Sequence, residues 1–178
     1  AHGRAAASAG AIKRCRPDKL VFTYQGDGDA ASIGIAETLY SAERNENFTQ
    51  IIVNNGVYGM TGGQMSPTSL VGQKTTTSVK GRDPKTMGMP LKISELISHF
   101  DVAYLARGSV HNAAHIRKTK TYIRRAFETQ MNQGGYNCVE MISPCPTNWH
   151  LTPLQAVERI EKEVLEYYPV REIKGGAR

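Results

Sequence analysis

The sequence predicts an α/β fold in which helices cover both faces of a doubly wound, mostly parallel sheet. Short β-rich apolar runs alternate along the chain with segments of helical periodicity, which is the pattern of such folds. The first run, residues 20–24 (LVFTY), is β-rich and mostly apolar, as in buried strands of a parallel sheet. With 178 residues, about one domain's length, we expect one domain over 1–170 and a C-terminal tail over 171–178.

Each expected element has its own local signal. The helix at 30–44 follows from the spacing of Ile33, Ala36, Leu39 and Tyr40, and the helix at 112–131 from a similar apolar stripe. A third helix starts at Thr152-Pro153 and runs to about residue 167, because Thr caps helices and Pro fits their first turn. The remaining expected elements are strands at 50–54, 101–106 and 137–142 and a short helix at 91–98, with loops at 55–90 and 143–152.

Composition excludes several classes of protein. A hydrophobic fraction of 40% with 21% charged residues is typical of a globular chain and excludes disorder as the main state. No apolar run approaches the ~18 residues of a transmembrane helix, and no secretory signal is visible. The three cysteines, Cys15, Cys138 and Cys145, form no disulfide framework, so we expect the reducing cytoplasm.

A Gly-Asp-Gly-Asp turn follows the first strand. Gly26 and Gly28 let the backbone approach a ligand, and the following helix start favours phosphate. Asp27 puts a carboxylate beside that phosphate position, and two anions are unfavourable together unless a cation lies between them. Mg²⁺ suits this arrangement, because it takes one or two carboxylates together with substrate phosphates. For Asp29 we keep two interpretations open, a helix N-cap and a direct contact to phosphate or metal.

A second polar pair ends the next strand. Twenty-five residues (29–53) separate Gly28 from Asn54-Asn55, enough for one helix and one strand. The two turns are therefore expected on neighbouring strand ends, facing one metal. An amide oxygen of Asn55 and a nearby backbone carbonyl are hard neutral ligands that complete such a site.

Gly-Asp-Gly followed by Asn-Asn at this distance resembles the thiamine diphosphate fingerprint. The resemblance implies that Asp27, Asn55 and the main-chain oxygen of Val57 hold Mg²⁺ on the cofactor's diphosphate. A dinucleotide-binding turn is the alternative, because Gly26, Gly28 and Ala31 also satisfy that pattern. It leaves Asn54-Asn55 unexplained and places Asp27 against a pyrophosphate.

Longer strings narrow the resemblance. Residues 54–68 (NNGVYGMTGGQMSPT), residues 2–4 (HGR) and residues 143–149 (SPCPTNW) resemble the β subunit of 2-oxoacid:ferredoxin oxidoreductases, and 74–78 (KTTTS) favours the 2-oxoisovalerate and 2-oxoglutarate types. Such enzymes decarboxylate a 2-oxoacid oxidatively, pass electrons to ferredoxin and form acyl-coenzyme A. The implied cofactor-binding residues are His2, Gly3, Gly26, Asp27, Gly28, Asp29, Asn55, Tyr58, Gly59 and Thr61.

The same resemblance implies partners and a cluster. The family's β subunit carries three cysteines ahead of His-Gly-Arg that bind a [4Fe–4S] cluster with one late cysteine, which Cys145 matches here. One thiolate cannot hold the cluster, so the chain is either truncated or cluster-free. Because the glutamate that activates the cofactor comes from another subunit in this family, we assign no catalytic residue here. We expect α-, γ- and δ-type partner subunits, and the chain alone to be inactive.

Other functions and substrates stay in view. A cluster-free thiamine diphosphate decarboxylase or dehydrogenase component is the main alternative. Branched-chain 2-oxoacids, 2-oxoglutarate and arylpyruvates all remain candidate substrates. The basic face of the 112–131 helix is expected to be a solvated surface or a docking surface for an acidic ferredoxin. Because the charge is modest and no aromatic stacking platform interleaves it, we expect no nucleic-acid partner. The absence of a long apolar run leads us to expect no membrane partner.

Overall fold

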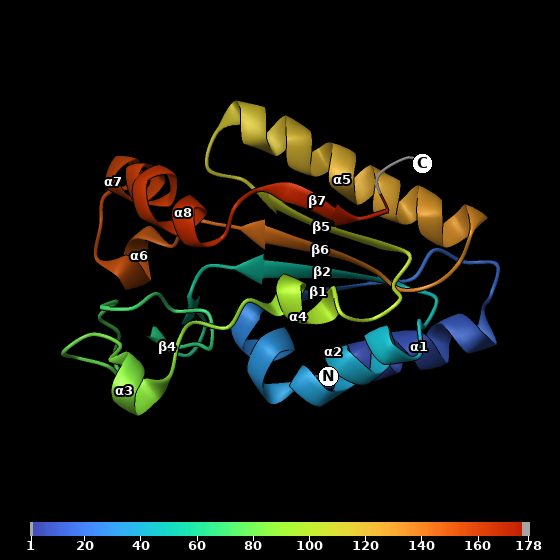
Figure 1. Ribbon diagram of the computed structural model, residues 1–178, viewed down its shortest axis with the longest axis horizontal. Helices are drawn as coiled ribbons and strands as arrows, with labels where there is room; N and C mark the ends of the chain where they lie inside the picture. The colour runs from blue at the N-terminus through green and yellow to red at the C-terminus, as the bar shows by residue number, and fades with distance from the viewer. Residues whose placement is uncertain (1, 176–178) are drawn as a thin grey trace.

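A five-stranded sheet forms the centre of the molecule, which we describe over residues 2–175 of a computed structural model (Figure 1). The strands lie in the order β1-β2-β6-β5-β7. Four are parallel and β7 runs antiparallel to β5. Their bounds are β1 (Phe22–Gly26), β2 (Thr49–Asn54), β5 (Tyr104–Ser109), β6 (Asn137–Ile142) and β7 (Arg171–Lys174). The predicted parallel α/β fold is thereby confirmed.

Helices cover the two faces of the sheet. One face carries α1 (Ala5–Cys15), α2 (Ile35–Glu43) and the short α4 (Ile93–Ile97), and the other carries α5 (Ala113–Asn132) (Figure 1). Buried apolar side chains fill both interfaces, as sheets and helices require. Ala6 and Ala9 of α1 lie in the first core, and Tyr122 and Ala126 of α5 lie in the second.

Strand and helix boundaries shift slightly from the sequence expectation. The first strand is Phe22–Gly26 rather than 20–24, and the strand expected at 101–106 is Tyr104–Ser109. The helix expected at 30–44 is divided by Gly34 into a π-helical turn η1 (Asp29–Ile33) and α2. Such π turns occur mostly as single turns and frequently at functional sites. The shift of β1 brings the Gly-Asp-Gly turn directly to the strand end.

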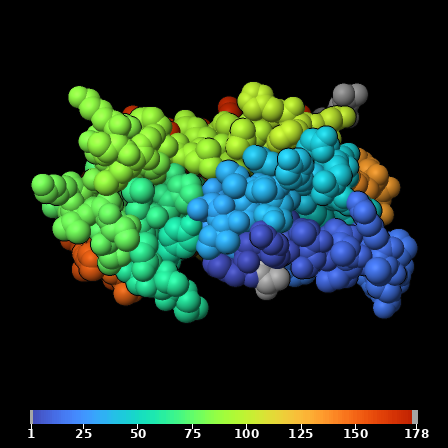
Figure 2. All heavy atoms as spheres, turned by 90° about the horizontal axis from the view of Figure 1, so that it is seen from below, coloured from blue at the N-terminus to red at the C-terminus, as the bar shows by residue number. Residues whose placement is uncertain are grey.

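The long segment after β2 is ordered by a two-stranded hairpin and a buried arginine. It contains β3 (Val57–Tyr58), β4 (Gln64–Met65) and the short α3 (Pro84–Met87). The guanidinium of Arg82 is buried and donates to the carbonyl oxygens of Pro67, Ser69 and Met89 at 2.7, 2.8 and 2.8 Å. This single cation satisfies carbonyls that no helix or sheet pairs. In Figure 2 the segment forms a projecting green lobe beside the blue α1 and cyan α2.

The C-terminal helical segment lies at the carboxyl ends of the strands, beside that lobe (Figure 1). It comprises α6 (Pro146–Trp149), α7 (Pro153–Arg159), the π turn η2 (Ile160–Val164) and α8 (Leu165–Tyr167). Thr152 caps α7 as expected, through a capping box with Gln155.

Two elements depart from the sequence analysis. Helix α1 was not predicted, because its Ala- and Gly-rich sequence lacks apolar periodicity. Strand β7 corrects the expected tail: residues 171–174 pair with β5, while 176–178 lie outside the described residues. Within residues 2–175, no helix combines the length and the apolar character needed to cross a membrane.

Candidate cofactor-binding site

The two polar turns lie on adjacent strands, as the spacing predicts. Strands β1 and β2 pair in parallel with Gly26 opposite Val53, so Asp27 and Asn54 are the next residues along each strand. Ligands of open α/β sheets bind beyond such carboxyl ends. The helical segment α6–α8 and the lobe after β2 gather at this same end (Figure 1).

Asp27 is a buried carboxylate whose partners are hydroxyls. Asp27 is only 1% exposed. Its Oδ2 accepts hydrogen bonds from Ser66 Oγ at 2.5 Å and from Thr68 Oγ1. Burial raises the pKa of Asp27 to about 6, although the two hydroxyls oppose that rise. No Lys, Arg or His among the described residues forms an ion pair with it. A buried carboxylate without a cation is the donor that a bound divalent metal needs.

Asn55 begins the loop that leaves β2. Its Oδ1 accepts from the backbone N–H of Val57 at 3.1 Å, an Asx turn, and its carbonyl oxygen accepts from Trp149 Nε1 at 3.0 Å. Gly56 takes φ +67°, which glycine adopts without strain. Asp27 and Asn55 together present carboxylate and amide oxygens, which fit Mg²⁺. Among the described residues no three His, Cys, Asp or Glu side chains gather as an alternative metal cluster.

Tyr58 packs directly onto the Gly-Asp-Gly turn. Its hydroxyl donates to the Gly28 carbonyl at 3.2 Å, and a Cβ built on Gly28 would lie 2.2 Å from the Tyr58 ring. Gly28 is therefore required for close approach of the ring. This contact joins two residues that the resemblance assigns to cofactor binding.

The N-terminal residues reach the same turn. Asp29 Oδ1 accepts from the Gly3 backbone N–H at 2.5 Å and lies 3.3 Å from His2 Nδ1, while Oδ2 accepts from Gln25 Nε2 at 2.9 Å. Asp29 is not the helix N-cap; Gly28 occupies that position. This contact brings His2 and Gly3 beside the strand end from 26 residues away in sequence.

Two further predicted residues lie on the loop between β3 and β4. Thr61 is exposed and its hydroxyl donates to Gln64 Oε1 at 2.6 Å. The Gly59 carbonyl accepts from Asn148 Nδ2 at 3.4 Å. The loop is thus connected to the turn that carries Cys145.

Cys145 stands at the start of α6, half-buried. Its Sγ accepts from Asn148 Nδ2 at 3.2 Å, the same amide that reaches Gly59. Cys138 is buried inside β6, where burial raises its pKa, and Cys15 is exposed at the end of α1. Cys145 is therefore linked to the loop after β2 through one shared partner, the side-chain amide of Asn148.

Several residues of the site were missed in the sequence. Ser66 and Thr68 belong to the quoted string but were given no role, and they contact Asp27 across 39 and 41 positions. Trp149 lies in the 143–149 string without a predicted role, and its indole N–H donates to the Asn55 carbonyl. Contacts over such distances leave no local pattern.

Comparison with known proteins identifies the family of the chain. Residues 1–141 match the family described as thiamine pyrophosphate enzyme, C-terminal TPP binding domain. The ketoisovalerate oxidoreductase subunit VorA of Methanothermobacter thermautotrophicus is 43% identical over 98% of this chain and 37% of its own length. The 2-oxoglutarate synthase subunit KorB of Archaeoglobus fulgidus is 33% identical over 90% of this chain and 56% of its own length.

A solved structure is similar as well. The 2-oxoglutarate:ferredoxin oxidoreductase from Magnetococcus marinus, with 2-oxoglutarate, coenzyme A and succinyl-CoA bound, superposes with a TM-score of 0.70 at 32% identity. The match covers 82% of this chain and 46% of that one. This chain therefore spans between about a third and a little over half of the length of these relatives.

Fold and site together define a cofactor-binding domain of the thiamine-dependent type. The chain belongs to the thiamine pyrophosphate enzyme family, as its C-terminal TPP binding domain. Its homologues are subunits of 2-oxoacid:ferredoxin oxidoreductases, which confirms the resemblance seen in the sequence.

Proposed function

We propose that this chain is the thiamine diphosphate-binding part of a 2-oxoacid:ferredoxin oxidoreductase. The observation that carries the proposal is the carboxylate of Asp27, which is buried and has no ion-pair partner among the described residues. It lies at the end of β1, next to the end of β2, where Asn55 follows. The names of its relatives are those of 2-oxoacid oxidoreductases and a 2-oxoglutarate synthase, and the solved relative holds 2-oxoglutarate, coenzyme A and succinyl-CoA. On this basis we assign the chain to an enzyme that decarboxylates a 2-oxoacid oxidatively, with transfer to coenzyme A and ferredoxin.

In this proposal Asp27, Asn55 and the Val57 carbonyl hold Mg²⁺ on the diphosphate. Gly26, Gly28 and backbone N–H groups of the following turn let the phosphates approach closely. When bound, the cofactor supplies the electron sink for loss of CO₂. The remaining assigned contacts are His2, Gly3, Asp29, Tyr58, Gly59 and Thr61.

The proposal includes partners and a cluster that this chain cannot provide alone. Cys145 serves as one ligand of a [4Fe–4S] cluster, and the other thiolates come from polypeptide outside residues 1–178. The glutamate that activates the cofactor comes from a partner subunit of α, γ or δ type. Free cysteines suit the reducing cytoplasm. Among substrates, the names of the relatives favour branched-chain 2-oxoacids and 2-oxoglutarate.

Calorimetric titration with thiamine diphosphate, first with Mg²⁺ and then with EDTA, tests the cofactor site. We expect metal-dependent binding by the assembly isolated with its partner subunits, and no turnover of a 2-oxoacid by the chain alone. An assembly that binds no thiamine diphosphate would refute the proposal. Iron analysis of the same assembly separates the cluster-containing oxidoreductase from a cluster-free decarboxylase or dehydrogenase component.

A further inference from the structure

We propose that Glu140 is a positioning residue for the metal site, acting through Asn54 on the backbone that carries Asn55 and Val57. The inference rests on the proposed function, because it concerns the Mg²⁺ ligands assigned there. Among the residues argued below, only Thr68 contacts an oxygen of an assigned metal ligand, the carboxylate of Asp27.

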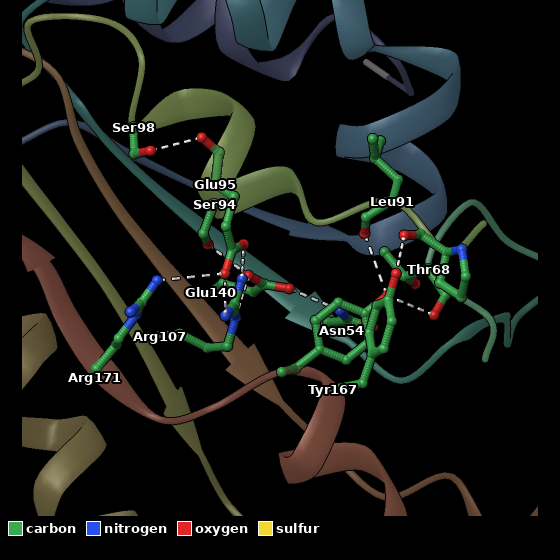
Figure 3. Close-up of polar contacts among 12 residues, drawn as sticks. Asn54, Thr68, Leu91, Ser94, Glu95, Ser98, Arg107, Glu140, Tyr167 and Arg171 are labelled. Carbon is green, nitrogen blue, oxygen red and sulfur yellow. Dashed lines mark hydrogen bonds and ion pairs between the residues drawn. The ribbon is translucent and has the colours of Figure 1, made fainter. Parts of the chain in front are cut away.

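Glu140 forms a fully buried ion pair with Arg107 (Figure 3). The two residues lie opposite each other on β6 and β5, and both side chains are 0% exposed. Arg107 Nε donates to Glu140 Oε2 at 2.8 Å, and Ser94 Oγ donates to the same oxygen at 2.5 Å. The other side of the guanidinium donates to Glu95 on α4, through Nη1 at 2.9 Å and through Nη2.

The second oxygen of Glu140 points to the end of β2. Oε1 accepts from Asn54 Nδ2 at 2.7 Å (Figure 3), and Asn54 Oδ1 accepts from the Gly56 backbone N–H at 3.2 Å. Asn54 is 4% exposed, so its amide is buried with Glu140 and Gly56 as its partners. Glu140 therefore fixes the amide orientation of Asn54, and that amide in turn fixes the start of the loop at Asn55.

A second path leads from the same ion pair to Asp27. The Arg107 guanidinium lies 5.4 Å from the Tyr168 ring centroid, a cation–π contact. The Tyr168 hydroxyl donates to the Thr68 carbonyl at 2.9 Å and to the Leu91 carbonyl at 3.2 Å, and the Thr68 hydroxyl donates to Asp27. Both assigned side-chain ligands are thus connected to one buried cation–anion pair.

Burying an ion pair is an expensive way to stabilise a core. Packed apolar residues of similar volume are often as stable or more stable, whereas a buried charge that has lost its partner is strongly destabilising. If the Glu140 carboxylate fixes the conformation of Asn54, a buried ion pair at this position has a reason. We infer that role from the direction of Glu140 Oε1 toward Asn54.

The variant Glu140→Gln tests whether the carboxylate orients the Asn54 amide, because it changes the hydrogen bonding of residue 140 but not its size. An amide that turns its oxygen to Arg107 and Ser94 turns its Nε2 toward Asn54 Nδ2, which places two donors face to face. Asn54 cannot rotate its amide without losing the Gly56 contact. The variant keeps the volume of the side chain but disturbs the Asn54 amide.

Glu95→Gln is the matched control. It weakens the partner on the other side of Arg107 without reaching Asn54, because the Glu95 carboxylate pairs with Arg107 and Arg171. Both variants remove one carboxylate from the same guanidinium. Because the Glu95 side chain is 30% exposed and that of Glu140 is fully buried, a purely stabilising network predicts a larger loss of stability for Glu140→Gln but no selective loss of Mg²⁺ affinity.

The experiment measures Mg²⁺ affinity by calorimetry at saturating thiamine diphosphate, on the assembly isolated with its partner subunits. We expect at least tenfold weaker binding for Glu140→Gln and less than a twofold change for Glu95→Gln. Without cofactor and metal, amide hydrogen exchange over residues 54–58 should accelerate only in Glu140→Gln. Melting temperatures of both variants report stability separately.

Four results would count against the inference or against the proposed function. Wild-type Mg²⁺ affinity in Glu140→Gln, or equal losses in the two variants, would overturn the inference. If Glu140→Gln does not fold, Asn54→Ala replaces it, because that variant leaves the Arg107–Glu140 pair intact; unchanged affinity there would likewise overturn it. A wild-type assembly that binds no thiamine diphosphate would instead refute the proposed function.

Discussion

The Tyr58 hydroxyl donates to the carbonyl oxygen of Gly28 at 3.2 Å, and its ring covers the space where any larger residue at position 28 would carry its Cβ. This contact joins the turn after β1 to the hairpin that follows β2. It makes residue 28 sensitive to size rather than to backbone conformation, because Gly28 has an ordinary φ of −64°.

Gly28→Ala should therefore destabilise the chain without the cofactor. The added methyl would lie 2.2 Å from the ring, so Tyr58 must move, at a penalty of roughly 1–3 kcal/mol for overpacking. Gly26→Ala is the control, because a Cβ there meets nothing within 4 Å. Urea unfolding of both variants measures this; equal stability of the two would contradict the packing described here.

Asp27→Asn should lose Mg²⁺-dependent binding of thiamine diphosphate yet gain stability in EDTA at pH 8. Burial raises the pKa of Asp27 from 3.8 to about 6, so the folded state holds this proton more tightly than the unfolded state. Above pH 6 the ionised carboxylate destabilises the fold by up to about 3 kcal/mol, and a neutral amide removes that penalty. Denaturant unfolding checks the gain; a less stable variant at pH 8 would contradict it.

Cys145→Ser should lower the iron content of the assembly and leave thiamine diphosphate binding intact. Serine is a poor ligand for an iron–sulfur cluster, whereas its hydroxyl can still accept from Asn148 Nδ2. Cys15→Ser is the control, because Cys15 is exposed at the end of α1. Iron analysis and cofactor titration on the same samples make the comparison. Full iron content in Cys145→Ser would remove Cys145 from the cluster.

His111 should make stability depend on pH. Burial, and then the nearby His115, lower its pKa below 6.5, while Glu161 opposes the shift. The unfolded state therefore takes up this proton first, and the contribution of neutral His111 is lost as pH falls below about 6.5. Its Nδ1 lies 2.7 Å from Ser109 Oγ and its Nε2 lies 2.9 Å from Asn112 Nδ2.

The measurement is the difference in unfolding free energy between wild type and His111→Gln at pH 7.5 and pH 5.5. Taking the difference cancels the contribution of Asp27, which is present in both proteins. The raised pKa of Asp27 makes the fold more stable as pH falls, opposite to the effect of His111. We expect wild type to lose more stability than the variant between these pH values. Parallel losses would show that His111 does not contribute.

The sequence was sufficient to place the two polar turns on neighbouring strand ends. Asp27 and Asn55 follow β-rich runs at a spacing of one helix and one strand, and the structure brings those strand ends together. The sequence was insufficient for Ser66 and Thr68, because only the folded loop carries them back to Asp27. Glu140 lies inside a predicted strand and Arg107 one residue beyond another, where a pattern gives no sign that two charges pair in the core.

Local propensity also decided which elements were found. Helix α5 has a clear apolar stripe and differs from its predicted range by one residue at each end. Helix α1 has Ala and Gly at its buried positions, which carry no periodic signal. Strand β7 is short and half-buried at the edge of the sheet, where alternation is weak.

The position of β1 in the sheet has a practical consequence for handling the isolated chain. Within residues 2–175 this strand pairs on one side only, with β2, and its side chains Phe22 and Tyr24 are 51% and 68% exposed. An open edge flanked by aromatic side chains is prone to pair with other chains. Concentrated samples of the chain alone should therefore self-associate and lose monomer over time. Light scattering before each titration would detect this loss.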